Sequence, residues 1–247
     1  MKKKTATGLL LKGSLRKSGV TIYERQGKLV TRTATSDMKR CNTLGQFKQR
    51  QKMRHTIALW KMLKLGCEEL MFTQRSTEYL NFSSLANRLP VVYVERIQMG
   101  NASFLMPGIP VSDGTLPAIQ QELGEVDGTP ALLTDLTNDE RNHHEKLLLY
   151  TATQTLENDF MPRVRFSVRK VTRRDMTLAD GRLILKGEEF GDDMKGWSLV
   201  RVIEDRCSAQ SIVTRCTLYQ QYTTEEALKA AAKSYGGLTD PSFLSPR

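Results

Sequence analysis

Histidine is the residue type in this chain best suited to metal binding or proton transfer, and the chain has three histidines. His55 stands alone in a basic stretch, whereas His143 and His144 are neighbours beside Glu140 and Glu145. Adjacent side chains point to opposite faces of a strand and lie about 100° apart on a helix, so these two cannot converge on one ion without ligands from elsewhere. We therefore expect no metal site.

Sequence motifs of known catalytic sites are absent. The chain has no G-x-S-x-G nucleophile elbow, no Walker phosphate-binding loop, no G-x-G-x-x-G dinucleotide loop and no H-E-x-x-H zinc motif. Trp60, Trp197 and Tyr219 lie in apolar patterns and are predicted to belong to the core rather than to a cofactor site. We expect a protein that is not an enzyme and has no cofactor; an enzyme with an unrecognised site is the least favoured alternative.

Carboxylates cluster in residues 187–193, whose sequence is GEEFGDD. These side chains could bind a cation, but they lack the alternating ligand order of an EF-hand loop. Such a loop more often connects two strands in solvent, or faces a basic neighbour. The candidate acidic counterparts to a basic neighbour are Glu188, Glu189, Asp192 and Asp193.

Positive charge is concentrated near the N-terminus. The net charge is +10, and residues 1–65 contain 17 lysine and arginine residues against only Glu24 and Asp37. The other 182 residues hold 20 basic and 25 acidic residues, so the chain is electrically bipolar. This imbalance predicts an anionic partner, either nucleic acid or an acidic protein, rather than an ordinary solvated face. The residues expected to contact it are Lys28, Arg32, Lys48, Arg50, Lys52, Arg54, Lys61 and Lys64.

Two elements are expected in the basic segment. β-Branched and aromatic residues on both sides of a Gln-Gly pair predict a β-hairpin over residues 20–32. A long helix is predicted over residues 44–65, which contain no proline and carry an apolar stripe that includes Met53 and Trp60. Hairpin and helix together form a predicted basic arm, residues 1–75.

The rest of the chain predicts a mainly β domain, residues 76–237, followed by a tail, residues 238–247. Glycine and proline in residues 100–130 indicate long connections around short strands. Strands are predicted at 91–94, from residue 146, and at 163–171, 182–185, 196–203 and 211–220; helices are predicted at 76–88 and 227–235. The predicted fold class is α+β, with a basic β-hairpin plus a long helix at the N-terminus, an antiparallel β sheet or sandwich in the C-terminal two-thirds, and a short C-terminal helix.

Several features favour synthesis in the cytoplasm. The apolar run at residues 9–11 is far shorter than the roughly 7 to 15 residues of a signal peptide, and nothing approaches the ~20 apolar residues of a membrane span. The cysteines show no C-x-x-C spacing, which predicts reduced thiols rather than a disulfide framework or a zinc site. They are Cys41, Cys67, Cys207 and Cys216.

Two stretches of the sequence carry a resemblance to known proteins. The hairpin ends in G-K-x-x-x-R at residues 27–32 and precedes a helix start of the form T-x-x-Q-x-x-x-R at residues 43–50. This arrangement resembles a group of Bacteroidetes and phage proteins. Residues 187–197 and 207–215 look like proteins of Bacteroides and their crAss-like phages.

The resemblance implies a virion component such as a ring, collar or tail protein, present in many copies. We therefore expect a structural or assembly subunit of a phage virion that assembles through its basic N-terminal arm as a homo-oligomer. Its expected partners are copies of itself, other virion proteins and packaged DNA. The alternative is a standalone basic nucleic-acid-binding protein, which would stay monomeric and bind in a salt-dependent way.

Overall fold

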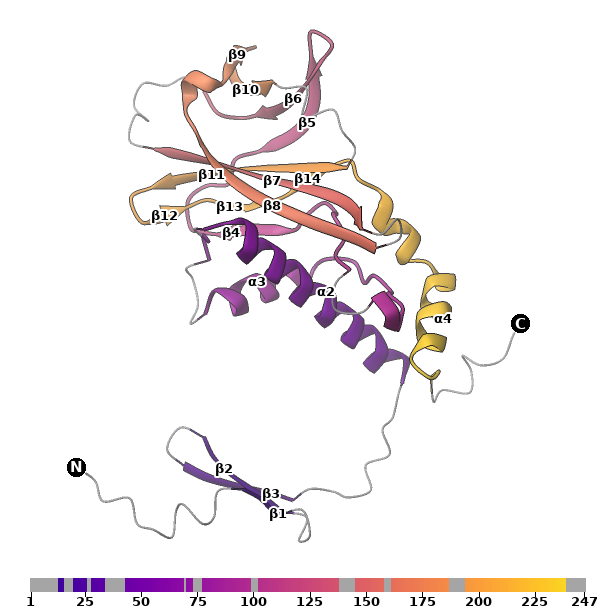
Figure 1. Ribbon diagram of the computed structural model, residues 1–247. Coiled ribbons are helices and arrows are strands. Elements are labelled where there is room, and N and C mark those ends of the chain that lie inside the picture. Colours follow the sequence, from indigo (N-terminus) through magenta and orange to yellow (C-terminus); the bar gives the residue numbers. More distant parts are fainter. Residues whose placement is uncertain are drawn as a thin grey trace, which may run out of the picture. The chain divides into compact units, whose positions relative to one another are not determined.

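The structure is a computed structural model of the 247-residue chain (Figure 1). It describes residues 13–15, 20–25, 28–33, 43–68, 70–72, 77–98, 102–137, 145–157, 161–186 and 194–238; in the first three ranges and at residue 157 it describes the backbone only. The chain divides into two compact units. We call Met1–Asn42 the N-terminal unit and Thr43–Arg247 the body.

The N-terminal unit contains a three-stranded antiparallel sheet in the order β1-β2-β3. Its strands are β1 (Gly13–Leu15), β2 (Val20–Arg25) and β3 (Lys28–Thr33). In the pairing of β2 with β3, Arg25 lies opposite Lys28, which confirms the predicted hairpin.

The body has three layers, seen in Figure 1 as a small sheet, a larger sheet and a layer of helices. The larger, five-stranded sheet has the order β12-β11-β7-β8, with β14 beside β11, and the small sheet has the order β5-β6-β10-β9. The larger sheet consists of β7 (Lys146–Glu157), β8 (Met161–Val171), β11 (Lys195–Ile203), β12 (Arg206–Cys207) and β14 (Val213–Thr214). The small sheet consists of β5 (Gln121–Val126), β6 (Thr129–Thr134), β9 (Thr177–Ala179) and β10 (Arg182–Lys186).

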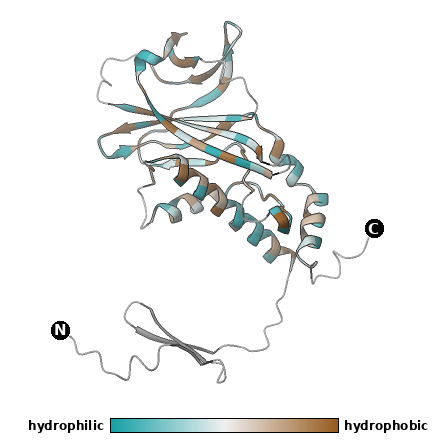
Figure 2. Cartoon of the chain, in the orientation of Figure 1, coloured by the Kyte–Doolittle hydropathy of each residue, from teal (hydrophilic) through white to brown (hydrophobic). Residues whose placement is uncertain are grey.

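The remaining elements complete an α+β fold, which confirms the predicted class. They are the helices α2 (Leu44–Gly66), α3 (Glu78–Ala86) and α4 (Glu225–Ser234), the strand pair β4 (Pro110–Asp113) and β13 (Ala209–Ser211), and single turns of 3-10 helix at Arg96–Gln98, Arg173–Asp175 and Leu218–Tyr222. Hydropathy alternates along β8 in Figure 2, as expected of a strand between a core and a polar face.

Two predicted strands are wrong. Residues 91–94 run between α3 and the 3-10 turn at Arg96–Gln98 without joining a sheet, because the backbone N–H and C=O of Val94 bond to the side chain of Gln51. Residues 211–220 leave the sheet after Thr214, whose side-chain oxygen accepts a hydrogen bond from the Cys216 N–H and so turns the chain. A 3-10 turn follows where the strand was expected.

The long helix α2 belongs to the body, not to the N-terminal unit with the hairpin. It packs onto β8 so closely that a Cβ atom added to Gly66 would lie 1.8 Å from the carbonyl oxygen of Phe166. Its other end joins a cluster with α4, in which Phe47, Leu228 and Leu238 are buried. The unit boundary therefore follows Asn42, whereas the predicted arm extended to residue 75. The predicted tail begins at a buried Leu238, and residues 239–247 lie outside the described residues.

The buried face of α2 differs from the predicted apolar stripe. Met53 is 57% exposed, whereas the polar residues Gln51 and His55 are buried. The Nε2 atom of His55 accepts a 3.1 Å hydrogen bond from the backbone N–H of Phe104. These polar side chains are buried because they satisfy the backbone of segments that pass through the core without strand partners.

Residues 102–106 form such a segment, and all five are buried. The side chain of Gln154 accepts a hydrogen bond from the Leu105 N–H at 2.6 Å and donates one to the Ser103 carbonyl at 3.3 Å. The Ser103 hydroxyl oxygen in turn accepts from the N–H of Val164 on β8. The backbone N–H of Ser103 also donates to the carbonyl oxygen of Pro162 on β8, so side chains supplement a single backbone bond where a regular strand pairing is missing.

The stability of the body is expected to fall in mild acid because of His55. Burial lowers the pKa of His55 from 6.5 to about 4. The unfolded chain therefore takes up the proton first, and the contribution of the neutral imidazole is fully present above pH 6.5 and is lost as pH falls through about 4. The shift corresponds to a loss of about 3 kcal/mol in the free energy of unfolding.

Urea unfolding of the wild type and of His55→Gln between pH 7 and 4 would measure this effect. A glutamine carbonyl oxygen can accept the Phe104 N–H but does not titrate, so the variant should lose less stability over this range. His143 and His144 lie outside the described residues and are present in both proteins. An equal loss in both proteins would contradict the role of His55.

Candidate anion-binding surfaces

The boundary between the two units is also a boundary of charge. Residues 1–42 contain 11 lysine and arginine residues and two acidic residues. The other 205 residues contain 26 basic and 25 acidic residues, so the body is close to neutral as a whole. The positive excess of the chain is therefore a property of the N-terminal unit.

Two of the predicted contact residues, Lys28 and Arg32, lie on β3 in this unit. They are opposite Arg25 and Thr21 of β2. The other side of β3 has no partner strand among the described residues. The sheet thus combines a row of basic positions with an edge that is open within the described part of this unit.

The six predicted contact residues on α2 divide into two groups. Lys52 donates a hydrogen bond to the carbonyl oxygen of Asn87, and Arg54 lies 4.8 Å from the ring centroid of Tyr235. These two side chains tie α2 to neighbouring elements of the body, which is a structural role that the sequence did not reveal. The exposed group comprises Lys48, Arg50, Lys61 and Lys64.

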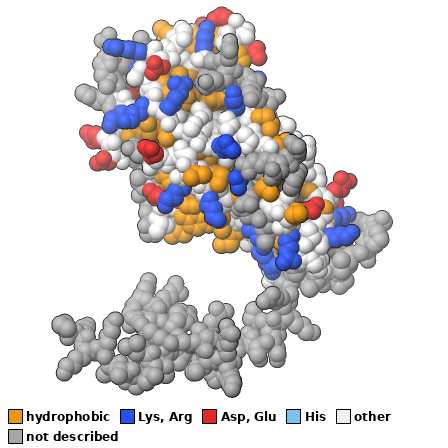
Figure 3. All heavy atoms as spheres, in the orientation of Figure 1, with side chains coloured by type: hydrophobic (Ala, Val, Ile, Leu, Met, Phe, Trp, Pro, Cys, Tyr) orange, Lys and Arg blue, Asp and Glu red, His pale blue; other side chains and the backbone are white. Residues whose placement is uncertain are grey.

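Exposed apolar residues lie among these cations. Met53 and Leu65 of α2 are 57% and 82% exposed, and Leu80 of α3 is also exposed. Met53 and Leu80 line a groove of about 480 Å³ between the two helices, together with hydroxyl and amide side chains. In the view of Figure 3, lysine and arginine side chains are dispersed over the body among hydrophobic and acidic ones.

The predicted acidic counterparts lie outside the described residues. Glu188, Glu189, Asp192 and Asp193 belong to the connection between β10 and β11. The structure describes both strands that this connection joins.

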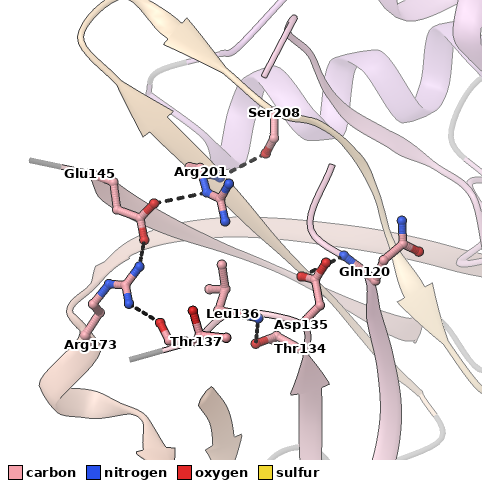
Figure 4. A network of polar contacts seen from close by, with 9 residues as sticks. All are labelled: Gln120, Thr134, Asp135, Leu136, Thr137, Glu145, Arg173, Arg201 and Ser208. Carbon is pink, nitrogen blue, oxygen red and sulfur yellow. Dashed lines mark hydrogen bonds and ion pairs between the residues drawn. The ribbon is translucent and has the colours of Figure 1, made fainter. Parts of the chain in front are cut away.

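A buried ion network lies where the small sheet meets the larger one (Figure 4). The side chain of Glu145 is 2% exposed and forms ion pairs with Arg173 and, at 3.0 Å, with Arg201. Arg173 also donates a hydrogen bond to the carbonyl oxygen of Thr137, just beyond β6. Since both neighbours of the carboxylate are cations held by other elements, the network joins the layers of the body and is not arranged for proton transfer.

A cleft of about 520 Å³ in the body is lined by residues of α3, β4, β5 and β13 and of the segments beside them. Its amide groups are used internally: Gln121 donates to the side chains of Ser198 and Gln210, and Gln210 donates to the carbonyl oxygen of Ile119. Arg88 is the one charged side chain among the residues lining it. A nucleophile with a neighbouring base is therefore not among these lining residues.

Metal and membrane sites were also sought in the described part of the chain. No group of His, Cys, Asp and Glu there is arranged to hold a metal ion. Cys67, Cys207 and Cys216 are buried thiols that form no disulfide, and burial raises the pKa of the Cys67 thiol to about 12. No helix in these residues is both long and apolar enough to cross a membrane.

The chain matches no protein-family model, no curated protein and no solved structure. A function for this protein must therefore be proposed from its charge distribution and from the geometry of the surfaces described above.

Proposed function

We propose that this protein is a structural subunit of a larger assembly, such as a ring, collar or tail of a phage virion, and that its basic N-terminal unit binds neighbouring subunits. The observation that carries the proposal is the coincidence of the charge boundary with the unit boundary at Asn42. A near-neutral folded body with a separate cationic extension is suited to linking copies through an acidic surface.

The small size of the N-terminal sheet supports this function. Its strands have only three, six and six residues, and a sheet of this size needs a hydrophobic face packed against something else for stability. The edge of β3 can pair with a strand of another chain, which would add backbone hydrogen bonds to the electrostatic attraction. The acidic connection at residues 187–193 of a neighbouring copy is the proposed counterpart.

Light scattering on the full chain at several protein and salt concentrations tests the proposal. The wild type should form an assembly that dissociates as salt rises, because salt screens contacts between exposed charges. Lys28→Glu with Arg32→Glu should weaken assembly by about tenfold, or about 1.4 kcal/mol per contact. Lys170→Glu with Arg182→Glu is the matched control, since it makes the same charge change at exposed positions of β8 and β10, outside the predicted contact residues, and should leave the mass unchanged.

A monomeric mass for the wild type over the whole concentration range would contradict assembly through this unit. The alternative function, a standalone nucleic-acid-binding protein, is favoured by the 11 cations within 42 residues. It predicts a monomer whose mass increases only when DNA is added and returns to the monomer value in high salt. The same measurement with and without DNA separates the two functions.

A further inference from the structure

The outer face of the larger sheet, the face turned away from α2 and α3, is only partly covered. The small sheet covers one half, where Leu149, Trp197 and Leu199 are buried in a cluster with Leu132 of β6 and with residues of β10. Trp197 is 1% exposed and marks the end of the covered half. No described element covers the other half, which is made of the remaining parts of β7, β8 and β11.

The strand register places basic and hydroxyl side chains together on this second half, which we call the basic sheet face. Its middle row runs across three strands, with Lys195 paired to Thr153 and Thr153 paired to Arg165. The rows on either side pair Thr155 with Arg163 and Thr151 with Ser167. Arg169 follows two residues further along β8, in the row of Leu149 at the border of the covered half, and its side chain is exposed. Val164 and Phe166 of β8 point the opposite way, into the core beneath the helices.

The exposure of these residues agrees with their position. Arg165, Ser167 and Arg169 are exposed, and Thr151, Thr153 and Lys195 are partly exposed. Thr151 and Ser167 hydrogen-bond to each other at 2.6 Å, so their hydroxyl groups are held in place. Acidic residues lie at the margins: Glu157 is opposite Met161 at the end of β7, and Asp175 is near Arg169.

The arrangement has the spacing of a phosphate-binding surface. Alternate residues on a strand lie about 6.7 Å apart and neighbouring strands about 4.8 Å apart, so the alternate positions Arg163, Arg165, Ser167 and Arg169 place three guanidinium groups and one hydroxyl along β8. The threonine hydroxyls of β7 lie alongside. Guanidinium groups bind phosphate oxygens with two hydrogen bonds, and serine and threonine hydroxyls add further phosphate contacts.

We infer that the basic sheet face binds the phosphate backbone of nucleic acid. Aromatic side chains that could stack on bases are not present among its described residues, since Trp197 is buried beside it. Binding is therefore independent of base sequence, and it is separate from any contact made by the N-terminal unit.

Fluorescence anisotropy with a labelled oligonucleotide of mixed sequence tests the inference on the full chain. Arg165→Gln with Arg169→Gln should weaken binding about tenfold at low salt and reduce the slope of log K against log salt by about 2, because each lost phosphate contact accounts for about 0.9. The control is Lys170→Gln with Arg182→Gln, which removes two exposed charges away from this face. It should change the slope by less than about 0.5.

Protection of lysines from acetylation gives a second readout. Bound oligonucleotide should protect Lys195, in the middle row, and leave Lys170, which points away from this face on β8, reactive. Equal loss of affinity in the two double variants would overturn the inference, since binding would then follow net charge alone. Equal protection of Lys195 by polyglutamate at the same charge concentration would also overturn it and would indicate an acidic protein partner.

Discussion

Glu145→Gln is expected to lower the free energy of unfolding of the body by about 3 kcal/mol, because it leaves two largely buried guanidinium groups without their shared counter-ion. The side chain of Glu145 is 2% exposed, and those of Arg173 and Arg201 are 15% and 22% exposed. Glu145 directly precedes β7, Arg173 lies in the turn after β8 and Arg201 lies on β11, so the lost ion pairs connect three parts of the fold. Urea unfolding followed by circular dichroism measures the change.

Glu225→Gln is the matched control for this prediction. Glu225 pairs with Lys229 one helical turn away at 3.4 Å, but both side chains are mostly exposed. Exposed ion pairs contribute less than about 1 kcal/mol, so the control should change stability little. If the two variants were equally stable, the network at Glu145 would be a solvated surface feature and would not hold the sheets together.

Local signals in the sequence were sufficient for the hairpin and for the starts of the helices. Thr43 and Thr224 accept hydrogen bonds from the backbone N–H groups of the first turns of α2 and α4, as capping residues do. The hairpin of β5 and β6 was missed, although Asp127 and Gly128 at its turn both have positive φ, as do Asp180 and Gly181 at the turn between β9 and β10. The Asp-Gly signal was present in both places, but nearby glycines and prolines concealed the first.

The buried polar residues could not be predicted in this way. Gln51, His55 and Gln154 are buried because segments far away in the sequence bring unpaired backbone groups to them. The apolar periodicity of α2 places Gln51 and His55 on the solvent side. The predicted buried face therefore included Met53, which is exposed in the structure. Only the tertiary arrangement shows which backbone groups need a partner.

The candidate sites, too, could be predicted only in part from the sequence. Composition alone locates the positive excess near the N-terminus, and the structure narrows it to residues 1–42. The alternation of Arg163, Arg165 and Arg169 with apolar residues is visible in the sequence, but not its alignment with Thr153 and Lys195. That alignment depends on two pairings of β7: one with β8, which follows it directly, and one with β11, which comes only after β9 and β10.

Because α2 packs directly on β8, adding one methyl group to α2 at Gly66 is expected to cause a large loss of stability. Gly66→Ala should lower the free energy of unfolding by at least about 3 kcal/mol, because the added Cβ would overlap the backbone of β8 and no side chain can move aside to relieve the contact. The nearest atoms are the carbonyl oxygen and carbon of Phe166, at 1.8 and 2.7 Å.

Gly45→Ala makes the same change at the other end of α2, where nothing lies within 4 Å of the added atom. It should stabilise the protein by up to about 1 kcal/mol, since alanine has the higher helix propensity. Thermal or urea unfolding of the two variants compares them directly, and a Gly66→Ala protein that fails to fold beside a folded Gly45→Ala protein counts as the expected result. Equal stability would mean that α2 does not dock on β8, and the helix would then be free to act with the hairpin as one extended arm.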